Sequence, residues 1–397
     1  MTSGLARLGE RSLFPHLTAR VYAHHAAIAP VSTVVQGAVS HALNRYAELG
    51  AGAFAEFLGQ RQRLRGKLEA LIGAEPDSVA LTANTTRGVS DVALCIPWQA
   101  GDRVVLFKGE FPANVTPWQQ AAHYHHLDLS WHDAADYLSS EADALQRLER
   151  DLQRGVRLVA VSAVQFQTGL RMPLEAIGQL CQRHGAELFV DAIQACGATP
   201  IDVRKLGIHY LASGGHKWMM GMEGSGFVYV SPSCAHQLEP VVAGWQSHQH
   251  AEDFLFRGAG LLRYDKPVKQ SALMLETGTL GVLGFVALEA GLDLVQQLGI
   301  PSVFAHIGQY LARLEAELEG RGFRSLRSRD PAGHSTILSV LPPAPLRALD
   351  VHSGLALRGI ICGVPDGILR FSPHWPNAMS EVDVIVAAID ELVAGQA

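Results

Sequence analysis

Residues 186–218 read AELFVDAIQACGATPIDVRKLGIHYLASGGHKW, and this stretch decides the fold. It contains two short apolar runs, Ala186–Asp191 and Tyr210–Ala212, separated by a polar segment. The first run ends on the carboxylate of Asp191, and the second is followed by a turn of small residues that presents Lys217. Short continuous apolar runs bounded by turn residues are typical of strands buried on both faces of a parallel sheet.

The same pattern extends on both sides of this stretch. Apolar runs rich in β-branched residues alternate with segments of helical spacing, and several of these segments end in Gly, as helix C-termini prefer. The strand-like runs are 78–82, 102–107, 156–162, 186–191, 210–212 and 226–231, and the helical segments are 60–73, 112–125, 143–155 and 173–185. This alternation predicts an α/β fold with a mostly parallel sheet, in which ligands bind beyond the carboxyl ends of the strands.

A second, smaller domain is expected in the C-terminal part. There a polar, histidine-bearing stretch (244–260) precedes an apolar helix at 280–299, followed by weaker strand runs and a final amphipathic helix. The length of 397 residues also suggests two domains, because one domain usually spans about 100–200 residues. We therefore expect a large domain at 20–270 and a small α+β domain formed by 1–19 and 290–397, joined by the helix 280–299.

Composition excludes several classes of protein. The chain is 48% hydrophobic and carries a formal charge of −6, so it can bury a large core and offers no broad positive surface for nucleic acid. Its five cysteines are scattered without a CxxC pair, which indicates a reduced, cytoplasmic protein without disulfides or a thiolate zinc site. No signal peptide and no run of about 18 uncharged apolar residues occur, so no association with a membrane is expected.

Two of the predicted strand ends suggest ligand binding. Thr85 and Thr86 open a helix after the run 78–82, where backbone N–H groups and the helix dipole favour an anion. An ordinary Asn or Thr N-cap is the alternative interpretation of this pattern. Phe111 follows the run 102–107 and can stack on a flat ligand, although aromatic residues belong more often to the core.

Two further strand ends suggest catalysis. A carboxylate that closes an apolar strand, as Asp191 does, is costly unless a positive group meets it, and a capping Asp is the alternative. Apolar surroundings disfavour the ammonium form of a lysine such as Lys217 and leave a nucleophilic amine, whereas a solvated loop lysine is the alternative. One ligand, pyridoxal 5'-phosphate, fits all four strand ends together. It needs an anion site for its phosphate, an aromatic residue to stack on its ring, an acid for its ring nitrogen and an amine for its aldehyde.

The chain resembles the class V aminotransferase family of fold-type I enzymes over nearly its whole length. VDAIQA (190–195) resembles the family's Asp-x-x-Gln motif, and GGHKW (214–218) follows at family-like spacing as the lysine motif. Further similarities lie in YAHHAAIAP (22–30), ANTTRG (83–88), GEFPANVTPW (109–118), ETGT (276–279) and ILRFSPHWPN (368–377). The resemblance implies a seven-stranded type of sheet and a homodimer with shared active sites.

Carried over residue by residue, the resemblance implies that Lys217 forms the Schiff base and that Asp191 pairs with the pyridinium nitrogen; both would be catalytic. The cofactor would also be held by Thr85, Thr86, Phe111, Gln194, Ser213, His216 and, from the other protomer, Thr279. Arg370 would bind the substrate carboxylate, because Arg forms bidentate pairs with carboxylates. His25 and His248 are further expected substrate contacts. No metal site is expected, because the histidine groups lack convincing co-ligands.

The resemblance implies an enzyme that transforms an amino acid through an external aldimine and a Cα carbanion. Loss of a Cβ leaving group makes it a lyase, protonation at the cofactor carbon an aminotransferase, and reprotonation at Cα an epimerase. We favour a side-chain lyase of the C–S type, because the phosphate loop and the segments 109–118 and 368–377 look most like that branch. A class V aminotransferase or an epimerase is the alternative, and a non-catalytic protein that binds pyridoxal phosphate is disfavoured.

Persulfide-forming desulfurase chemistry is not expected from the sequence. Cysteine desulfurases place a catalytic Cys on an extended loop before the carboxylate-binding Arg, whereas here only the short segment Cys362–Leu369 precedes Arg370. Cys362 also lies in an apolar run, which is typical of a core residue.

Overall fold

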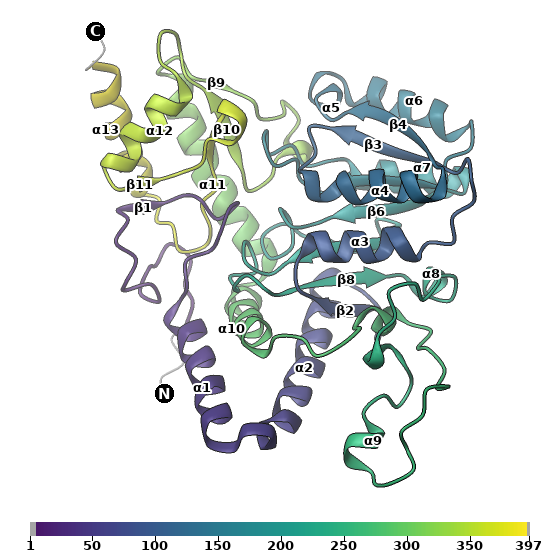
Figure 1. Cartoon of the computed structure of the whole chain (residues 1–397). Helices are drawn as coiled ribbons and strands as arrows, with labels where there is room; N and C mark the ends of the chain where they lie inside the picture. The colour runs from purple at the N-terminus through teal and green to yellow at the C-terminus, as the bar shows by residue number, and fades with distance from the viewer. Residues whose placement is uncertain (1–4, 395–397) are drawn as a thin grey trace.

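A seven-stranded sheet lies at the centre of the larger part of the chain (Figure 1). The structure, a computed structural model, describes residues 5–394. The spatial order of the strands is β2-β8-β7-β6-β5-β3-β4, and all neighbours are parallel except β8, which is antiparallel to β2 and β7. The strands are β2 (Val79–Thr82), β3 (Arg103–Lys108), β4 (Asp128–Asp133), β5 (Leu158–Ser162), β6 (Glu187–Asp191), β7 (Tyr210–Gly214) and β8 (Gly226–Val230). The predicted fold class is therefore confirmed.

The two apolar runs of residues 186–218 form β6 and β7, which pair in parallel. Every residue of β5, β6 and β7 is buried, as expected for strands covered on both faces. The register places Ser162, Asp191 and Ala212 side by side, so the side chains that follow these strands reach one edge of the sheet. The edge strand β4 was not predicted, because its sequence DLSWHD is half exposed and has no apolar run.

Helices cover both faces of this sheet, as Figure 1 shows. One face carries α3 (Thr85–Cys95) and α4 (Thr116–His125). The other face carries α2 (Phe54–Ile72), α6 (Glu141–Leu152) and α7 (Leu174–His184). α4, α6 and α7 each connect one parallel strand to the next. This is why the sequence alternates between the continuous apolar runs of strands and the helical spacing of apolar residues.

The C-terminal residues form a smaller antiparallel sheet in the order β12-β10-β9, flanked by helices. Its elements are α11 (Ile300–Glu319), β9 (Arg324–Ser325), β10 (Leu338–Leu341), α12 (Ala348–Leu357), β12 (Leu369–Phe371) and α13 (Glu381–Ala394). α10 (Val282–Leu298) leads into this part from the larger one and lies within the helix expected at 280–299. Within residues 5–394 no single helix is long and apolar enough to cross a membrane; α10 and α11 meet that test only as a pair bent by 78°.

The N-terminal segment runs between the two parts. β1 (Val21–Tyr22) pairs in parallel with β11 (Ile360–Ile361), and His24 forms an isolated bridge with Ser372. A few residues later the backbone contacts the large sheet's loops, where Ala29 N–H donates to the carbonyl of His216. Residues 21–24, which the sequence assigned to the start of the large domain, thus hydrogen-bond with the C-terminal part.

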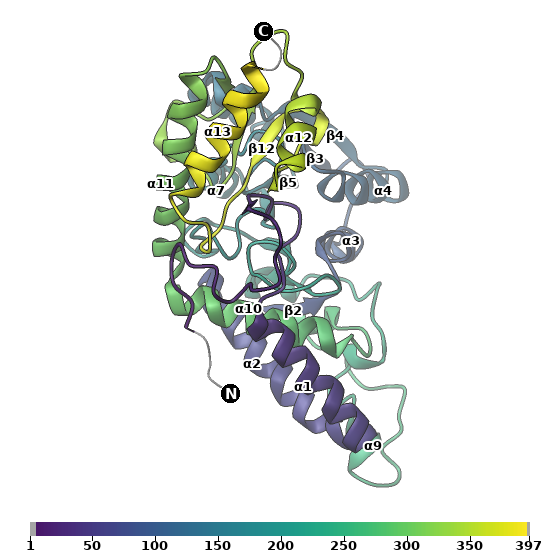
Figure 2. The same ribbon diagram turned by 90° about the vertical axis from the view of Figure 1, so that its left-hand side faces the viewer.

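α1 (Thr33–Leu49) and α2 extend from the larger part as a pair of helices, and Figure 2 shows them with α9 in a narrow arm. α1 packs along α10. The remaining short helices are α5 (Asp136–Ser139), α8 (Pro232–Ala235), α9 (Asp253–Phe256), η1 (Gly50–Ala53), η2 (Pro112–Asn114), η3 (Trp245–Ser247), η4 (Ala272–Leu275), η5 (Pro331–Gly333) and η6 (Pro365–Gly367).

Candidate active site

Asp191 and Lys217 lie at the carboxyl ends of the neighbouring strands β6 and β7. Asp191 is the last residue of β6 and is 2% exposed, and its Oδ1 accepts the N–H of Ile193 at 3.0 Å. Lys217 lies in the tight turn after β7, which the hydrogen bond from Gly221 N–H to the Gly215 carbonyl closes at 3.0 Å. Parallel pairing of the two strands therefore brings the predicted acid and the predicted amine to one place.

Burial shifts the pKa values of this acid and this amine toward each other. Desolvation raises the pKa of Asp191 to about 6, although the Ile193 N–H and the charge of Lys217 oppose the shift. Desolvation lowers the pKa of Lys217 to about 8, which the charge of Asp191 opposes and the charge of Arg370 reinforces. A lysine shifted in this direction provides a free amine near neutral pH, as a nucleophile or base requires.

The N-terminus of α3 provides a cradle for an anion beside this pair. Asn84 caps the helix by accepting the N–H of Arg87 at 2.8 Å, while Thr85 is buried and Thr86 is exposed in the first turn. The hydroxyl of Thr85 has no hydrogen-bond partner within residues 5–394. The ring of His216 packs close to Gly214, because a Cβ added to Gly214 would lie 3.2 Å from this ring. Glycine at position 214 therefore leaves room for the His216 ring.

Phe111 and Gln194 frame the lysine. The Nζ of Lys217 lies 5.9 Å from the centre of the Phe111 ring, which is half exposed and free to stack on a planar group. Gln194 is buried, with its Oε1 accepting the indole N–H of Trp218 at 2.9 Å and its amide donating to the Ala26 carbonyl at 3.0 Å. One N–H of the Gln194 amide therefore stays available to a ligand.

Arg370 reaches the same place from the smaller part of the chain. It lies in β12, is 5% exposed, and donates from Nη1 to the carbonyl of Phe166 at 2.8 Å. Phe166 in turn packs edge-on against Phe111, with ring centres 5.4 Å apart. The Nε of Arg370 is buried without a partner among the described residues, and burial lowers the pKa of the guanidinium to about 10.

Two residues that the sequence did not single out belong to this site. Burial together with the charges of Arg370, His352 and Lys217 lowers the pKa of His24 to about 4, so its ring is neutral there. The His24 ring also lies beside Gly363 and Arg370, and its Nδ1 has no partner within residues 5–394. In an extended segment successive side chains point to opposite faces, so this alternation was the available signal that His24, rather than its neighbour, faces Arg370.

Glu110 is the second such residue. Its carboxylate accepts the backbone N–H of Ser162 at 2.7 Å and also the hydroxyl of Ser162, at the end of β5. Burial and the nearby charge of Asp191 raise the pKa of Glu110 to about 7, against the effect of these hydrogen bonds. No local signal distinguishes this Glu from a surface residue, because its partner Ser162 is 52 positions away.

The single chain also shows the surroundings of four other predicted site residues. His25 is buried behind His24, with Nδ1 at 3.2 Å from the Ser372 carbonyl. Ser213 is fully buried, and its hydroxyl donates to the Gly214 carbonyl. His248 binds the Lys266 carbonyl with Nδ1 in the segment before η4. Thr279 is exposed and lines an apolar groove in the arm.

The described residues fit pyridoxal 5'-phosphate. The unpartnered Thr85 hydroxyl and the N-terminus of α3 provide donors for a phosphate. Asp191 supplies a buried acid, Phe111 a ring face and Lys217 an amine with a lowered pKa. Among residues 5–394 no group of three or more His, Cys, Asp or Glu side chains is arranged to hold a metal ion.

Known families and proteins match most of the chain. The profile of the family described as Aminotransferase class-V matches residues 21–362. A probable cysteine desulfurase of Methanothermobacter thermautotrophicus is 27% identical over 95% of this chain and 96% of its own length. An isopenicillin N epimerase of Streptomyces clavuligerus is 25% identical over 83% of each chain.

Solved structures show the same fold. The cystine C–S lyase C-DES, in complex with its reaction product cysteine persulfide, superimposes with a TM-score of 0.85 at 24% identity, covering 94% of this chain and 98% of that one. The cysteine desulfurase CsdA from Escherichia coli superimposes with a TM-score of 0.81 at 24% identity, covering 97% of each chain.

Proposed function

We infer that this chain, which belongs to the class V aminotransferase family, is a pyridoxal-phosphate-dependent enzyme that cleaves a C–S bond in the side chain of an amino acid. The observation that carries this proposal is the convergence of Asp191, Lys217 and Arg370, three groups with opposing charges and shifted pKa values, from both parts of the chain. An amino acid with a sulfur on Cβ is the substrate class, as the names of the related lyase and desulfurases suggest.

The cofactor, bound to the amine of Lys217, would supply an electron-withdrawing pyridinium ring at the Cα of the substrate. We assign its phosphate to Thr85, Thr86 and His216 at the α3 cradle, with Ser213 supporting the turn through its hydrogen bond to Gly214. Asp191, which is ionised above a pKa of about 6, would face the ring nitrogen, and Phe111 would stack on the ring. The free amide N–H of Gln194 would donate to the phenolic oxygen of the ring.

The substrate carboxylate would bind to Arg370. The Phe166 carbonyl holds Nη1 of Arg370 and leaves the buried Nε unpartnered, so this guanidinium has donors ready for a carboxylate. His24 lies beside it with a ring that stays neutral because its pKa is about 4, and it would hydrogen-bond to the substrate without adding charge. His25 would support His24 from behind by its contact with the Ser372 carbonyl.

The amine of Lys217, once free, would remove the proton from Cα. In an elimination the C–H electron pair then forms the Cα=Cβ bond, and the Cβ–S bond breaks with its pair on the departing thiolate. Water hydrolyses the released 2-aminoacrylate to pyruvate and ammonia. The lowered pKa of Lys217 serves this step, because an amine with a pKa of about 8 has a larger free-base fraction near neutral pH than an ordinary lysine.

A direct elimination fits this chain better than a desulfurase mechanism that places the sulfur on an enzyme cysteine. All five cysteines are buried, and burial raises the pKa of Cys362 to about 12. A thiol with such a pKa is scarcely ionised near neutral pH and is a poor nucleophile. The relatives described as cysteine desulfurases are therefore guides to the substrate class and not to the sulfur acceptor.

We also propose that the chain works as a homodimer. The groove that Thr279 lines also contains Leu43, Tyr46 and Leu283, three large apolar side chains that the single chain leaves partly exposed. A second copy packed on this arm would cover them and would bring Thr279, and the segment of His248, toward the partner's site. Five unpaired cysteines fit a reducing compartment, which supports a cytoplasmic location.

Product analysis tests the proposed reaction. Purified protein loaded with pyridoxal phosphate is incubated with L-cystine, L-cysteine and S-methyl-L-cysteine, and pyruvate and ammonia are measured without a 2-oxo acid. We expect equal amounts of both products, and no products from the Lys217→Ala variant. A Cys362→Ala variant should keep full activity, because the buried thiol has no part in the elimination.

Other outcomes would contradict this assignment in specific ways. Activity that depends on an added 2-oxo acid would identify an aminotransferase. Exchange of the Cα hydrogen with solvent deuterium and loss of optical activity, without pyruvate, would identify an epimerase. Loss of activity in Cys362→Ala would restore the desulfurase mechanism.

A further inference from the structure

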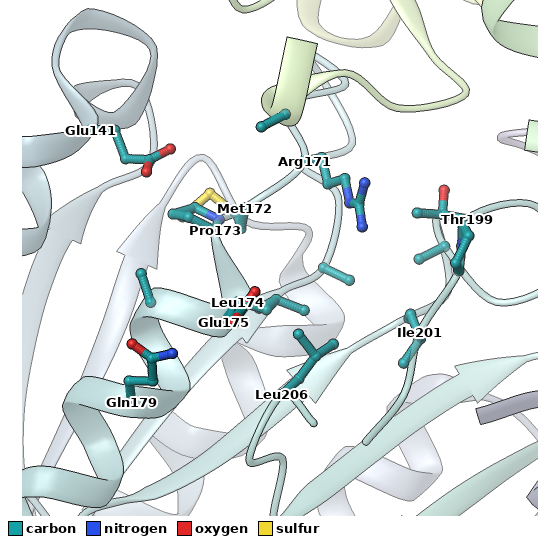
Figure 3. Close-up of a pocket in the computed structure, with 15 residues that line it drawn as sticks. Glu141, Arg171, Met172, Pro173, Leu174, Glu175, Gln179, Thr199, Ile201 and Leu206 are labelled. Carbon is teal, nitrogen blue, oxygen red and sulfur yellow. The ribbon is translucent and has the colours of Figure 1, made fainter. Parts of the chain in front are cut away.

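A cavity of about 460 Å³ lies between α7, the loop after β6 and the smaller part of the chain (Figure 3). Its size is within the range of about 300–1,000 Å³ that is usual for small-molecule sites. Ala163, Ala195 and Thr199 line it from the large sheet's loops, and Ala332 lines it from the smaller part. None of its lining residues belongs to the site around Lys217, so the proposed reaction leaves this cavity without a role.

The cavity contains an arginine whose charge has no partner. Within residues 5–394 the side chain of Arg171 makes no hydrogen bond and no ion pair, and burial alone acts on its pKa, which it lowers. The carbon of its guanidinium lies over the ring of Phe304, 5.7 Å from the ring centre. A cation–π contact of this kind leaves the N–H donors of the guanidinium free to bind an oxygen. An arginine held in this way is prepared to bind a planar anion such as a carboxylate.

The first turn of α7 adds donors at the same cavity. Pro173 precedes the helix and provides no side-chain cap, and Leu174, Glu175 and Ala176 all line the cavity. The N–H of Leu174 donates to the Met172 carbonyl at 2.8 Å, whereas those of Glu175 and Ala176 have no acceptor among the described residues. Free N–H groups at a helix N-terminus favour an anion. Thr199 faces Arg171 across the cavity in Figure 3, is 4% exposed, and has a hydroxyl without a hydrogen-bond partner among the described residues.

The remaining wall is apolar with acids at its margin. Leu174, Ile201 and Leu206 supply the apolar surface below and between the charged groups in Figure 3. Glu141 lies on the side of the cavity away from Arg171, and its carboxylate is exposed. This distribution fits a short molecule with a carboxylate at one end and an apolar body.

We propose that this cavity is a second binding site, which takes a small carboxylate with a short apolar chain and binds its carboxylate through Arg171. Amino acids and 2-oxo acids share this chemistry.

The site is connected to the substrate site through one hairpin. Residues 163–172 form this hairpin, closed by the bridge between Val164 and Arg171. At its tip the Phe166 carbonyl accepts from Arg370, and Arg171 N–H at its base donates to the Gly333 carbonyl of the smaller part. A ligand that holds Arg171 would therefore restrain the hairpin that positions Arg370.

Calorimetric titration with isovalerate tests the site, because this carboxylate has an apolar chain and lacks the amine needed for reaction. The titration uses cofactor-loaded protein carrying Arg370→Gln, so that binding at the proposed substrate carboxylate site is removed. We expect one isovalerate per chain, and binding at least about tenfold weaker when Arg171→Gln is added. 3-Methylbutan-1-ol, which has the same apolar chain but neither a carboxylate nor an amine, should not bind.

Two further variants make the result specific. Ala176→Leu narrows the cavity without changing its charge and should also weaken isovalerate binding. Arg204→Gln removes an exposed arginine that lines a different pocket beside α7 and should leave binding unchanged. Separate titrations of L-leucine and 4-methyl-2-oxopentanoate distinguish the two ligand sources, and only the binding that is lost when Arg171→Gln is added belongs to this site.

The proposal is wrong if isovalerate does not bind in the Arg370→Gln background, or binds equally in the presence and absence of Arg171→Gln. Neither outcome bears on the elimination reaction, because that is measured with Arg370 intact. If Arg171→Gln unfolds the protein, the Ala176→Leu variant decides the question on its own.

Discussion

At the scale of single residues, the site depends on charged groups placed where water is excluded. Asp191 and Lys217 carry opposite charges, and each reduces the shift that burial causes in the pKa of the other. Between His24 and Arg370 the effect is the opposite, since the charge of the guanidinium adds to burial in lowering the pKa of His24 and helps to keep the imidazole neutral. The chemistry of each group therefore depends on its neighbours more than on its residue type.

The capture of pyridoxal phosphate by cofactor-free protein should depend on the protonation of Lys217. At a pH below the pKa of Lys217, which is about 8, the amine is mostly an ammonium ion and cannot attack the aldehyde. The rate should therefore rise as pH passes through about 8. In Asp191→Asn the midpoint should move to lower pH, because the removed carboxylate stabilised the ammonium ion. The change in absorbance on cofactor binding, followed from pH 6 to 10, measures this; an unchanged midpoint in the variant would contradict the pairing.

Glu110 should make the protein less stable at higher pH. Because its pKa is raised from 4.5 to about 7, the folded state binds its proton more tightly than the unfolded chain does. The free energy of unfolding from this group is thus greatest below pH 4.5 and falls as pH rises to about 7. Glu110→Gln should remove this decrease, which urea unfolding of wild type and variant at pH 5 and pH 8 would reveal. A decrease of equal size in both proteins would exclude Glu110 as its source.

At the scale of elements, the turn that holds Lys217 depends on close contact with α10. Gly291 on this helix approaches the backbone of the turn so closely that a Cβ would lie 2.4 Å from the carbonyl oxygen of Met220. Gly221 in the turn also lies close to α10, since a Cβ added to it would lie 2.9 Å from Cα of Leu288. These glycines are needed because backbone meets backbone, and no side chain can move away.

Gly291→Ala should therefore displace the turn. Overpacking of this kind costs about 1–3 kcal/mol of folding stability, and the shift of Lys217 should lower activity more than the loss of stability alone would. Gly308→Ala on α11 is the matched control, because nothing lies within 4 Å of its Cβ position. That variant should gain about 0.5–1 kcal/mol, since alanine is the better helix former. Thermal unfolding and activity of both variants measure the contrast.

At the scale of the whole molecule, the site is divided between two parts of the chain and, in our proposal, between two chains. Lys217 and Asp191 come from the larger part and Arg370 from the smaller one, while Thr279 lies in the arm. The N-terminal segment links the two parts, because it pairs with β11 and also hydrogen-bonds to the loops of the large sheet.

A charge in the groove of the arm should prevent dimer formation. Leu43→Glu places a carboxylate among the apolar side chains around Thr279, and the mass measured by light scattering should fall to that of one chain. Cofactor retention should fall with it, because Thr279 would no longer reach the partner's site. Leu357→Glu, on α12 and 87% exposed, is the control and should change neither property. A monomeric wild type would overturn the proposed dimer.

The sequence predicted those features whose signal is local. Continuous apolar runs identified the central strands, and the family's motifs around Asp191 and Lys217 identified the class V aminotransferase family, which the family match confirmed. β4 and α11 were missed: β4 is an exposed edge strand, and α11 follows α10 after the single residue Gly299. The division into domains at the predicted boundaries stays a prediction.

The sequence by itself determined the fold class, the family and the residues that end the central strands, because each depends on short apolar runs and motifs within a few positions. Only the tertiary structure decided that His24 faces Arg370, that Glu110 binds Ser162 and that the charge of Arg171 has no partner. These facts depend on burial and on contacts between distant segments, and the pKa of a group or its need for a partner follows from the atoms around it.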